Sequence, residues 1–272
     1  MTDKSAPLLA VRGVSSSYIS RSYGVFGRKT EKPVLRGVSL EMGRGEIFGL
    51  VGESGCGKTT LGRCILGLID YSGEIIIDGL PGRAGRLSRE RALKVQAVFQ
   101  DPSGALNPVK TVGWLLEEPL RVHRLGTKRE REKKASRILE MVGMDGSYRK
   151  RRPAELSSGQ KQRVSIASAL MLEPKLLIAD EPVSALDVSV GAQILNIFRD
   201  LNRSLGLSIL FISHNLSLVY YLCGRIAVMR RGSIIEQGEA EEICSNPREP
   251  YTAALLNAAS AFDFAGNSRF NR

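Results

Sequence analysis

Continuous hydrophobic runs recur along the chain, and segments of helical period lie between most of them. The runs with the character of buried strands cover residues 46–52, 94–100, 176–181, 207–213 and 225–232. Helical patterns lie at 112–143 and between the last three runs. Strands that alternate with helices predict an α/β fold with parallel strands and crossover helices.

The N-terminal part has a different pattern. Its segments 8–18, 34–42 and 74–79 read as short β-strands, and the polar linker 19–33 between the first two is predicted to be a surface loop. The helical stretch from about 105 to 163 interrupts the α/β order, so we expect it to form a lobe of its own. The predicted segments are 1–104 (β-subdomain and first half of the core), 105–163 (helical subdomain), 164–245 (second half of the core) and 246–272 (C-terminal tail).

A glycine-rich stretch, GESGCGKT from Gly52 to Thr59, directly follows the strand at 46–52 and precedes a helical pattern. It matches G-x-x-x-x-G-K-[ST], in which glycines let backbone N–H groups turn around nucleotide phosphates. Lys58 adds a positive charge there, and the Thr59 hydroxyl suits Mg²⁺. Because strand, loop and helix follow in this order, the stretch predicts a phosphate-binding loop rather than an ordinary glycine turn.

Two acidic residues, Asp180 and Glu181, end the run LLIADE. Sheets of α/β proteins bind their ligands at the carboxyl ends of the strands. Asp180 is therefore expected to hold Mg²⁺ indirectly, and Glu181 to orient or deprotonate an attacking water. Taken alone, the run could equally end in a helix cap. The phosphate-binding loop favours the catalytic interpretation.

Gln100 and His214 also follow short hydrophobic runs, in FQDP and SILFISH. The side-chain amide of Gln100 could contact Mg²⁺ or the attacking water. His214 is expected at the same sheet edge as Lys58 and Asp180. Without that context, a surface glutamine and a structural histidine would be the simpler interpretations.

A second turn of small residues, LSSGQ from Leu156 to Gln160, leads into a helical pattern. Such a turn exposes backbone N–H groups and the positive end of the helix dipole, which together suit an anion. The chain therefore carries two candidate anion-binding turns.

Composition limits the function classes without choosing among them. Hydrophobic residues make up 43% of the 272 residues and charged residues 25%, which is ordinary for a globular protein. No hydrophobic run is long enough to span a membrane, and the N-terminal residues lack the order of a signal peptide. We therefore expect a cytoplasmic protein. The four cysteines lack C-x-x-C spacing and are expected to be reduced thiols rather than zinc ligands.

The formal net charge of +11 raises the question of a nucleic-acid or anionic membrane partner. However, the basic run 128–134 contains Glu130 and Glu132 and heads a helical segment. Aromatic residues are not interleaved with it, so the pattern favours a solvated helix face over a nucleic-acid patch.

The ordered motifs GESGCGKT, FQDP, LSSGQ, LLIADEP, SALD and ISH together resemble the nucleotide-binding subunit of ABC transporters, over residues from about 8 to 258. The resemblance implies a P-loop NTPase core with an N-terminal antiparallel β-subdomain and an inserted helical subdomain. It also implies ATP hydrolysis with Mg²⁺, and head-to-tail packing of two ATPase domains in which each LSSGQ turn caps the ATP on the partner's P-loop. A second anion-binding turn would then serve the partner's ATP.

The resemblance assigns roles to individual residues. The implied catalytic residues are Glu181, His214 and Gln100, and the implied metal-binding residues are Thr59, Gln100 and Asp180. The implied nucleotide-binding residues are Tyr18 (against adenine, with Tyr23 as an alternative), Gly52, Glu53, Ser54, Gly55, Cys56, Gly57, Lys58, Thr59, Thr60, Ser157, Ser158, Gly159 and Gln160. Asp187 belongs to the D-loop. Ser158 replaces the usual glycine, and a serine would be strained at any position that requires a positive φ.

A narrower resemblance concerns the transported solute. Residues 100–113, the FGRK-containing N-terminal loop and the tail segment 246–258 resemble ATPases of bacterial dipeptide, oligopeptide and nickel importers, although Glu249 stands where a histidine is expected. The implied partners are a second, non-identical ATPase subunit (or a second copy of this chain), a membrane permease and, indirectly, a substrate-binding protein. The chain would lie at the cytoplasmic face of the membrane, and no nucleic-acid partner is expected. The alternatives are a soluble ABC ATPase of phosphonate (C–P lyase) metabolism and a DNA-repair or translation ABC ATPase.

Overall fold

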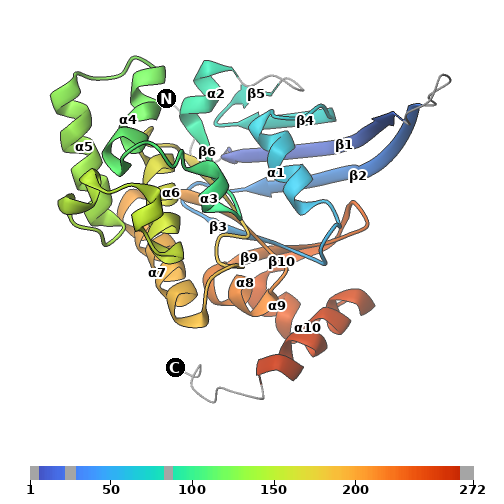
Figure 1. Cartoon of the computed structure of the whole chain (residues 1–272). Helices are drawn as coiled ribbons and strands as arrows, with labels where there is room; N and C mark the ends of the chain where they lie inside the picture. Colours follow the sequence, from blue (N-terminus) through green and yellow to red (C-terminus); the bar gives the residue numbers. More distant parts are fainter. Residues whose placement is uncertain (1–5, 22–28, 83–87, 264–272) are drawn as a thin grey trace. The chain divides into compact units, whose positions relative to one another are not determined.

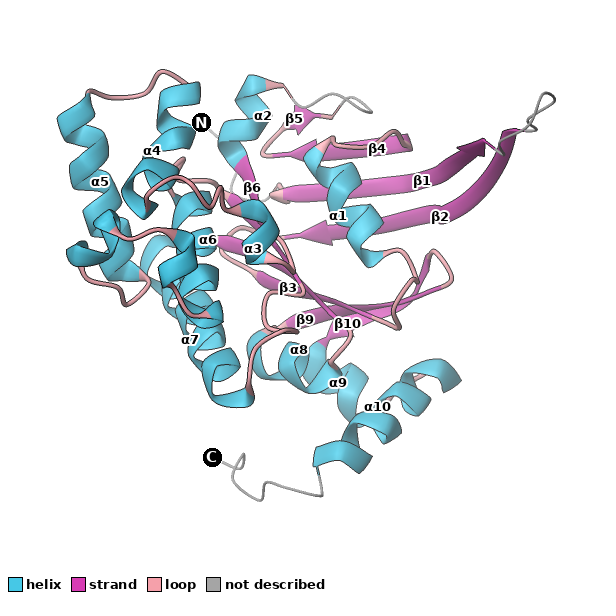
Figure 2. Cartoon of the chain, viewed as in Figure 1, coloured by secondary structure: helices cyan, strands magenta, loops and turns pink. Residues whose placement is uncertain are grey.

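The computed structural model describes residues 6–21, 29–82 and 88–263. The chain divides into two compact units. The first unit comprises Met1–Arg86 and Leu210–Arg272, and the second unit is the intervening stretch Leu87–Ile209. Figure 1 shows the elements in chain order, and Figure 2 separates helices from strands.

The first unit contains most of the strands. Its elements are β1 (Leu9–Arg21), β2 (Lys29–Met42), β3 (Ile47–Val51), α1 (Lys58–Leu66), β4 (Ser72–Ile77), β5 (Leu80–Pro81), α8 (Leu216–Leu222), β9 (Arg225–Arg230), β10 (Ser233–Glu239), α9 (Ala240–Ser245) and α10 (Pro250–Asp263). One sheet has the order β2-β1-β4-β5, and β1 pairs antiparallel with both β2 and β4. The predicted N-terminal β-subdomain is therefore present.

The hairpin of β1 and β2 corrects one expectation. Residues 19–33 were predicted to be a surface loop, but β1 continues to Arg21 and β2 begins at Lys29, with Arg21 paired to Lys29. Backbone hydrogen bonding between antiparallel strands can extend a hairpin without a hydrophobic alternation, so the polar sequence hid it. Tyr23, the alternative adenine contact, lies outside the described residues.

The other sheet has the order β10-β9-β3-β8-β7-β6. In the first unit β3 pairs parallel with β9, and β9 pairs antiparallel with β10. In the second unit β6 (Val95–Val98) pairs parallel with β7 (Leu176–Asp180). The division between the units falls inside β8 (Ser208–Ser213). Strands β3, β7 and β8 are buried along their whole length, as their continuous hydrophobic sequences predict.

The second unit is mainly helical. Its helices are α2 (Arg89–Lys94), α3 (Pro102–Ala105), α4 (Val112–Val122), α5 (Lys128–Met141), α6 (Ser158–Leu170) and α7 (Val188–Leu205), with 3-10 turns at Gly146–Lys150 and Pro153–Glu155. The hydrophobic side of α5 is buried through Ala135, Ile138 and Leu139. The predicted helical block at 112–143 is thus present as α4 and α5.

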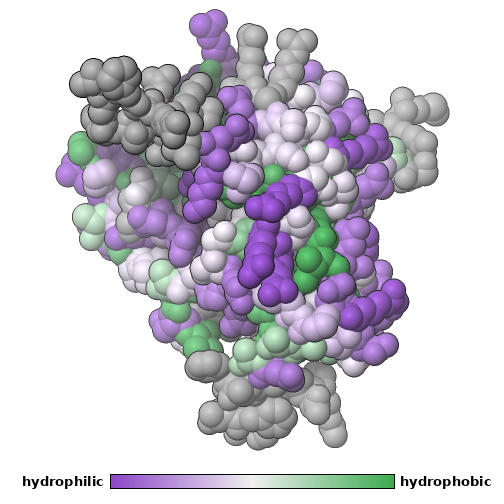
Figure 3. Space-filling view, turned by 90° about the vertical axis from the view of Figure 1, so that its right-hand side faces the viewer, coloured by the Kyte–Doolittle hydropathy of each residue, from purple (hydrophilic) through white to green (hydrophobic). Residues whose placement is uncertain are grey.

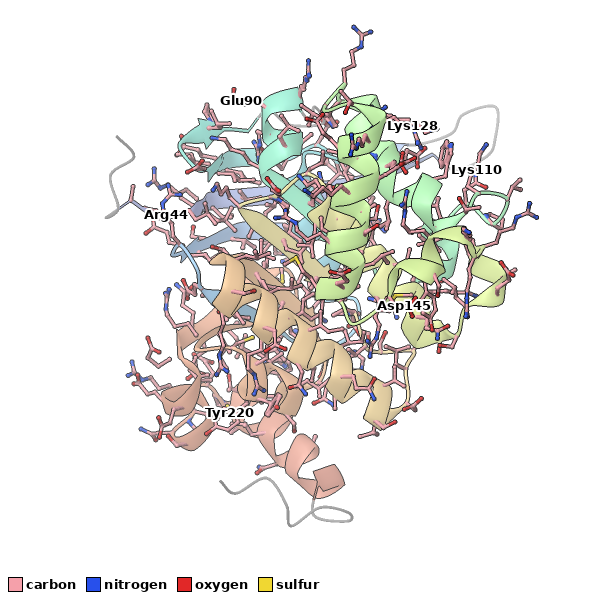
Figure 4. All side chains as sticks on the ribbon, turned by 90° about the vertical axis from the view of Figure 1, so that its left-hand side faces the viewer. Arg44, Glu90, Lys110, Lys128, Asp145 and Tyr220 are labelled. Carbon is pink, nitrogen blue, oxygen red and sulfur yellow. The ribbon has the colours of Figure 1, made fainter. Side chains whose placement is uncertain are left out.

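The basic run heads α5, as predicted. Thr127 caps the helix in a capping box with Glu130, and Figure 4 labels Lys128 at this end of α5 and Asp145 beyond the other. Lys134 and Arg137 both form ion pairs with Glu173, at 2.9 and 3.2 Å. The hydrogen bond from Lys134 holds the pKa of Glu173 below its usual value. Part of the basic charge is therefore used in local ion pairs.

All four cysteines lie in the described part of the chain and carry free thiols. Cys56, Cys64 and Cys223 are buried, and Cys244 is partly buried. Burial raises the pKa of Cys64 and of Cys244 to about 11. Since the thiolate is the reactive form, burial makes these two thiols poor nucleophiles.

One face of the molecule carries mainly polar side chains. Figure 3 shows one face on which hydrophilic side chains predominate, with hydrophobic groups between them. Among the helices of the described residues, none has the length and hydrophobicity needed to cross a membrane.

Candidate active site

The P-loop, Gly52–Thr60, joins the buried strand β3 to helix α1 in the first unit. The helix begins at Lys58, and its N-cap, Gly57, has the left-handed backbone angles φ 115° and ψ 1°. No side chain caps this helix. Its first N–H groups, together with the helix dipole, form the kind of terminus that binds phosphate.

Close packing explains why the loop needs glycine. A Cβ on Gly52 would lie 2.2 Å from the carbonyl oxygen of Met229. A Cβ on Gly57 would lie 3.0 Å from side-chain carbons of Leu35 and of Met229. Substitution at either position would force the loop away from its neighbours.

Lys58 is folded back into the loop and is 5% exposed. Its ammonium donates hydrogen bonds to the carbonyl oxygens of Gly52 at 2.7 Å and Glu53 at 3.0 Å. The Cys56 thiol is also buried, 3.9 Å from the ammonium, and burial raises its pKa. The loop thus holds a positive charge at the start of α1, and Cys56 contributes packing.

The remaining predicted residues of the first unit lie in this loop, on β1 or directly after β8. Thr60 is buried, Thr59 is half-buried, and Glu53, Ser54 and Gly55 are exposed. Tyr18 lies on β1 with its side chain exposed. His214 is exposed and directly follows β8, which neighbours β3 in the sheet.

In the second unit, Gln100 and Asp180 come to the same sheet edge. Strands β6 and β7 are parallel, with Val98 opposite Ala179. Gln100 follows the end of β6 and is exposed, and Asp180 is the last residue of β7 and is 6% exposed. This is the edge at which the hydrophobic runs predicted ligand-binding groups.

Glu181 follows Asp180 with an unusual backbone. Its φ is +51°, in the left-handed region that a residue with a side chain seldom adopts. Its carbonyl oxygen accepts hydrogen bonds from the hydroxyl of Ser184 at 3.0 Å and the N–H of Ser184 at 3.3 Å. A tight turn therefore fixes the direction in which the chain leaves β7.

The signature turn, Ser157–Gln160, begins helix α6 with a capping box. The Ser157 hydroxyl accepts from the N–H of Gln160 at 3.3 Å, and the Gln160 side-chain oxygen accepts from the N–H of Ser157 at 3.0 Å. The Gln160 amide nitrogen donates to the hydroxyl of Tyr148 at 3.0 Å. The guanidinium of Arg151 lies 4.4 Å from the centre of the Tyr148 ring. Side chains thus cap α6 at this turn, whereas no side chain caps α1 at the P-loop.

The serine that replaces a glycine in this turn is unstrained. Ser158 is the first residue of α6 and does not have a positive φ. The glycine that remains is the one that packing requires, because a Cβ on Gly159 would lie 2.4 Å from Cγ1 of Val190 on α7. The strain that a positive φ would have caused at Ser158 does not arise.

Asp187, the predicted D-loop residue, caps α7. Its carboxylate accepts from the N–H of Val190 at 2.9 Å and from the hydroxyl of Ser189 at 2.7 Å. These hydrogen bonds, that of Val190 first, lower the pKa of Asp187.

Two tyrosines at these turns were missed by the sequence analysis. Tyr148 holds Gln160, and Tyr251, on α10, accepts a hydrogen bond from the N–H of Glu53 at 3.2 Å. Neither contact has a local pattern, and Tyr251 lies 198 residues from its partner. The tail was interpreted only as a mark of the transported solute, but it also touches the P-loop.

The sequence model of the family described as "ABC transporter" matches residues 35–184, more than half of the chain. The chain belongs to the ABC transporter family. A putative peptide import ATP-binding protein of Brucella ovis is 45% identical over 260 residues, covering 94% of this chain and 80% of the relative. The dipeptide transport ATP-binding protein DppF of Escherichia coli is 44% identical over 259 residues, covering 93% of this chain and 76% of the relative.

Solved structures agree with this placement. The cassette cbiO1 from Clostridium perfringens, part of the ABC transporter complex cbiONQ, has a TM-score of 0.75 and 27% identity, covering 92% of this chain and 99% of its own. A dimeric post-hydrolysis state of the cassette MJ0796 bound to ADP and Pi has a TM-score of 0.72 and 28% identity, covering 85% of this chain and 98% of its own. The predicted fold and the predicted ATPase class are confirmed: the chain is an ABC ATPase. The roles of the individual site residues stay predictions.

Proposed function

We propose that this ATPase drives uptake of peptides, or of a related small solute, through a membrane permease. Two observations, each made within its own unit, carry the proposal. In the first unit the P-loop around Lys58 begins α1 without a side-chain cap, and in the second unit β7 ends at Asp180 and is followed by Glu181. The import direction and the solute class rest on relatives that are named for peptide import and dipeptide transport. Phosphonate metabolism, DNA repair and translation lack comparable support.

The donor groups suit a nucleotide with Mg²⁺. Thr59, Gln100 and Asp180 offer oxygen ligands, which Mg²⁺ prefers. Among the described residues, no group of three or more His, Cys, Asp or Glu could hold a metal ion by itself. Mg²⁺ that is bound with a nucleotide usually has few protein ligands and shares its coordination with the phosphates. When bound, Mg²⁺ would neutralise charge on the phosphates.

We propose the following roles for the individual residues. Lys58 and the N–H groups of the P-loop bind the phosphates, and Tyr18 stacks on adenine. Glu181 orients the attacking water and accepts its proton, while Gln100 and His214 contact the same water or the γ-phosphate. In the segments that we propose, 105–163 is the lobe that moves with Gln100 when the γ-phosphate binds.

The second anion-binding turn points to a partner cassette. Ser157–Gln160 would bind the γ-phosphate held on the P-loop of another subunit, so that one chain carries two half-sites. A non-identical ATPase subunit is the proposed partner, and a second copy of this chain is the alternative. ATP would stabilise the pair because its γ-phosphate is bound by both halves.

Dilution of the purified chain tests whether each ATP site is shared between two subunits. We expect the purified chain to have weak ATPase activity whose rate per chain rises with protein concentration, and to gain activity sharply when the cognate subunit and permease are added. Light scattering during the titration reports the mass. A rate per chain that stays constant down to low nanomolar concentration, with a monomeric mass throughout, would rule the shared site out.

The segment 103–112 is the proposed contact with the permease. Within it, Val109 has an exposed fraction of 71%, and it precedes helix α4. Such a contact would hold the chain at the cytoplasmic face of the membrane. Crosslinks from this segment should reach a cytoplasmic loop of a membrane protein in native vesicles. Crosslinks that reach only soluble enzymes or nucleic acid would favour one of the alternatives.

A further inference from the structure

The C-terminal helix α10 reaches the P-loop through Tyr251. The Tyr251 side chain is 9% exposed, and its hydroxyl accepts a hydrogen bond from the N–H of Glu53 at 3.2 Å. The guanidinium of Arg230 lies 4.6 Å from the centre of the Tyr251 ring. All three residues belong to the first unit. The tyrosine is therefore packed on one side while its hydroxyl is directed at the loop.

The bonded N–H belongs to the peptide group that joins Gly52 to Glu53. The carbonyl oxygen of the same peptide group accepts the 2.7 Å hydrogen bond from the Lys58 ammonium. Tyr251 and Lys58 thus hold opposite sides of one peptide plane. Hydrogen bonds in such a chain polarise and strengthen one another.

The start of α10 is itself anchored to β10. The Glu236 carboxylate accepts hydrogen bonds from the N–H of Arg248 at 2.8 Å and the N–H of Glu249 at 3.3 Å, just before the helix begins. In Figure 1 the helix lies beside α8 and α9 in the first unit. Glu249, in place of the expected histidine, takes part through its backbone.

We infer that Tyr251 is a positioning residue for nucleotide binding. By holding the Gly52–Glu53 peptide, it fixes the carbonyl that orients Lys58, so the C-terminal helix sets the affinity of the P-loop for phosphate. The inference goes beyond the import function and rests only on nucleotide binding at the P-loop. It predicts that the tail acts on ADP and ATP alike, because both place a β-phosphate in the loop.

The test is the variant Tyr251→Phe, which keeps the ring and removes the hydroxyl. We expect its affinities for ADP and for ATP to fall by the same factor, about threefold to tenfold, as for the loss of one hydrogen bond. The turnover rate at saturating ATP should change little, so the effect appears in KM. Binding is measured with a fluorescent ADP analogue, and thermal unfolding is measured without nucleotide. A purely structural tyrosine would lower the unfolding temperature and leave the affinity unchanged.

The matched control is Tyr220→Phe on α8, because the Tyr220 side chain is 51% exposed (Figure 4). It should leave the affinity as in the wild type. A second variant, Glu236→Gln, keeps the tyrosine and weakens the anchor of α10. It should lower the affinity about twofold to threefold, and Tyr251→Phe should add less in this background than alone. If Tyr251→Phe fails to fold, Glu236→Gln carries the test.

Unchanged ADP affinity in Tyr251→Phe, or an equal loss in Tyr220→Phe, would overturn the inference. So would a wild-type chain that does not bind ADP. A wild-type chain that binds ADP but never couples ATP hydrolysis to uptake with its permease would instead contradict the proposed function and leave the role of Tyr251 intact.

Discussion

The P-loop and the signature turn are both helix N-termini with small residues, yet they are built in opposite ways. In the P-loop, Gly57 caps α1 without any side chain, and the buried Lys58 supplies a charge. In the signature turn, the side chains of Ser157 and Gln160 form a capping box that satisfies two backbone N–H groups, and the cap carries no charge. The N-terminus of α1 thus has no side-chain cap, whereas the capping box at α6 uses two N–H groups internally.

This difference teaches which turn can bind a nucleotide unaided. The P-loop is preformed around the Lys58 ammonium, so we expect a single chain to bind a nucleotide there. The signature turn offers fewer donors and no cation, so it should add to binding only when a partner presents a phosphate. Affinity should therefore depend mainly on the first turn, and closure of a dimer on the second.

The largest effect is expected for a variant that lowers turnover without changing ATP binding at either turn. Glu181→Gln leaves the P-loop and the signature turn intact but removes the proposed base. ATP binding should stay near the wild-type level, while turnover should fall about 100-fold to 10,000-fold. Equilibrium binding and steady-state ATPase assays measure the two quantities. Hydrolysis at the wild-type rate would contradict the assignment.

The next effect tests the unequal affinity of the turns. Lys58→Ala removes the cation of the P-loop and should weaken ATP binding about 10-fold to 100-fold, as for the loss of charged hydrogen bonds. Ser157→Ala, in the signature turn, should leave the affinity of a dilute chain unchanged and impair only dimer closure. Titration calorimetry at low protein concentration compares the two variants. Equal losses of ATP affinity in the two variants would contradict the proposed difference between the turns.

Reciprocal swaps test the two backbones. Gly57→Ser places a side chain at a φ of 115° and against Leu35 and Met229, so we expect the free energy of unfolding to fall by about 1–3 kcal/mol. Ser158→Gly restores the usual signature sequence at a helical position and should cost at most about 0.5–1 kcal/mol. Urea denaturation of both variants gives the comparison. Activity well above wild type in Ser158→Gly would show that the serine does limit closure.

The smallest effect concerns Tyr148. Tyr148→Phe removes the acceptor for the Gln160 amide, which holds the signature turn from outside. ATP affinity of the dilute chain should not change, and the ATPase rate of the dimer should fall about twofold to fivefold. The concentration at which the rate per chain is half maximal should rise. A fall in monomer affinity would contradict the division of roles between the turns.

Local patterns predicted much of this architecture. The strands β3, β7 and β8 followed from continuous hydrophobic runs, and the P-loop from glycines between a strand and a helix. The β1–β2 hairpin was missed because its pairing uses backbone groups, which leave no hydrophobic period in the sequence. The contacts of Tyr251 with Glu53 and of Gly159 with Val190 were missed because they depend on tertiary packing. The absence of backbone strain at Ser158 could not be predicted either, because its backbone angles depend on the residue at which α6 begins.

The left-handed backbone at Glu181 has a consequence for engineering. A residue with a side chain in this conformation is less stable than glycine by about 1–2 kcal/mol. Glu181→Gly should therefore relax the turn after β7 while removing the proposed base. In a library of variants, selection for thermal stability alone should enrich Glu181→Gly, and selection for ATP hydrolysis should deplete it. Stability and activity thus favour opposite residues at this position.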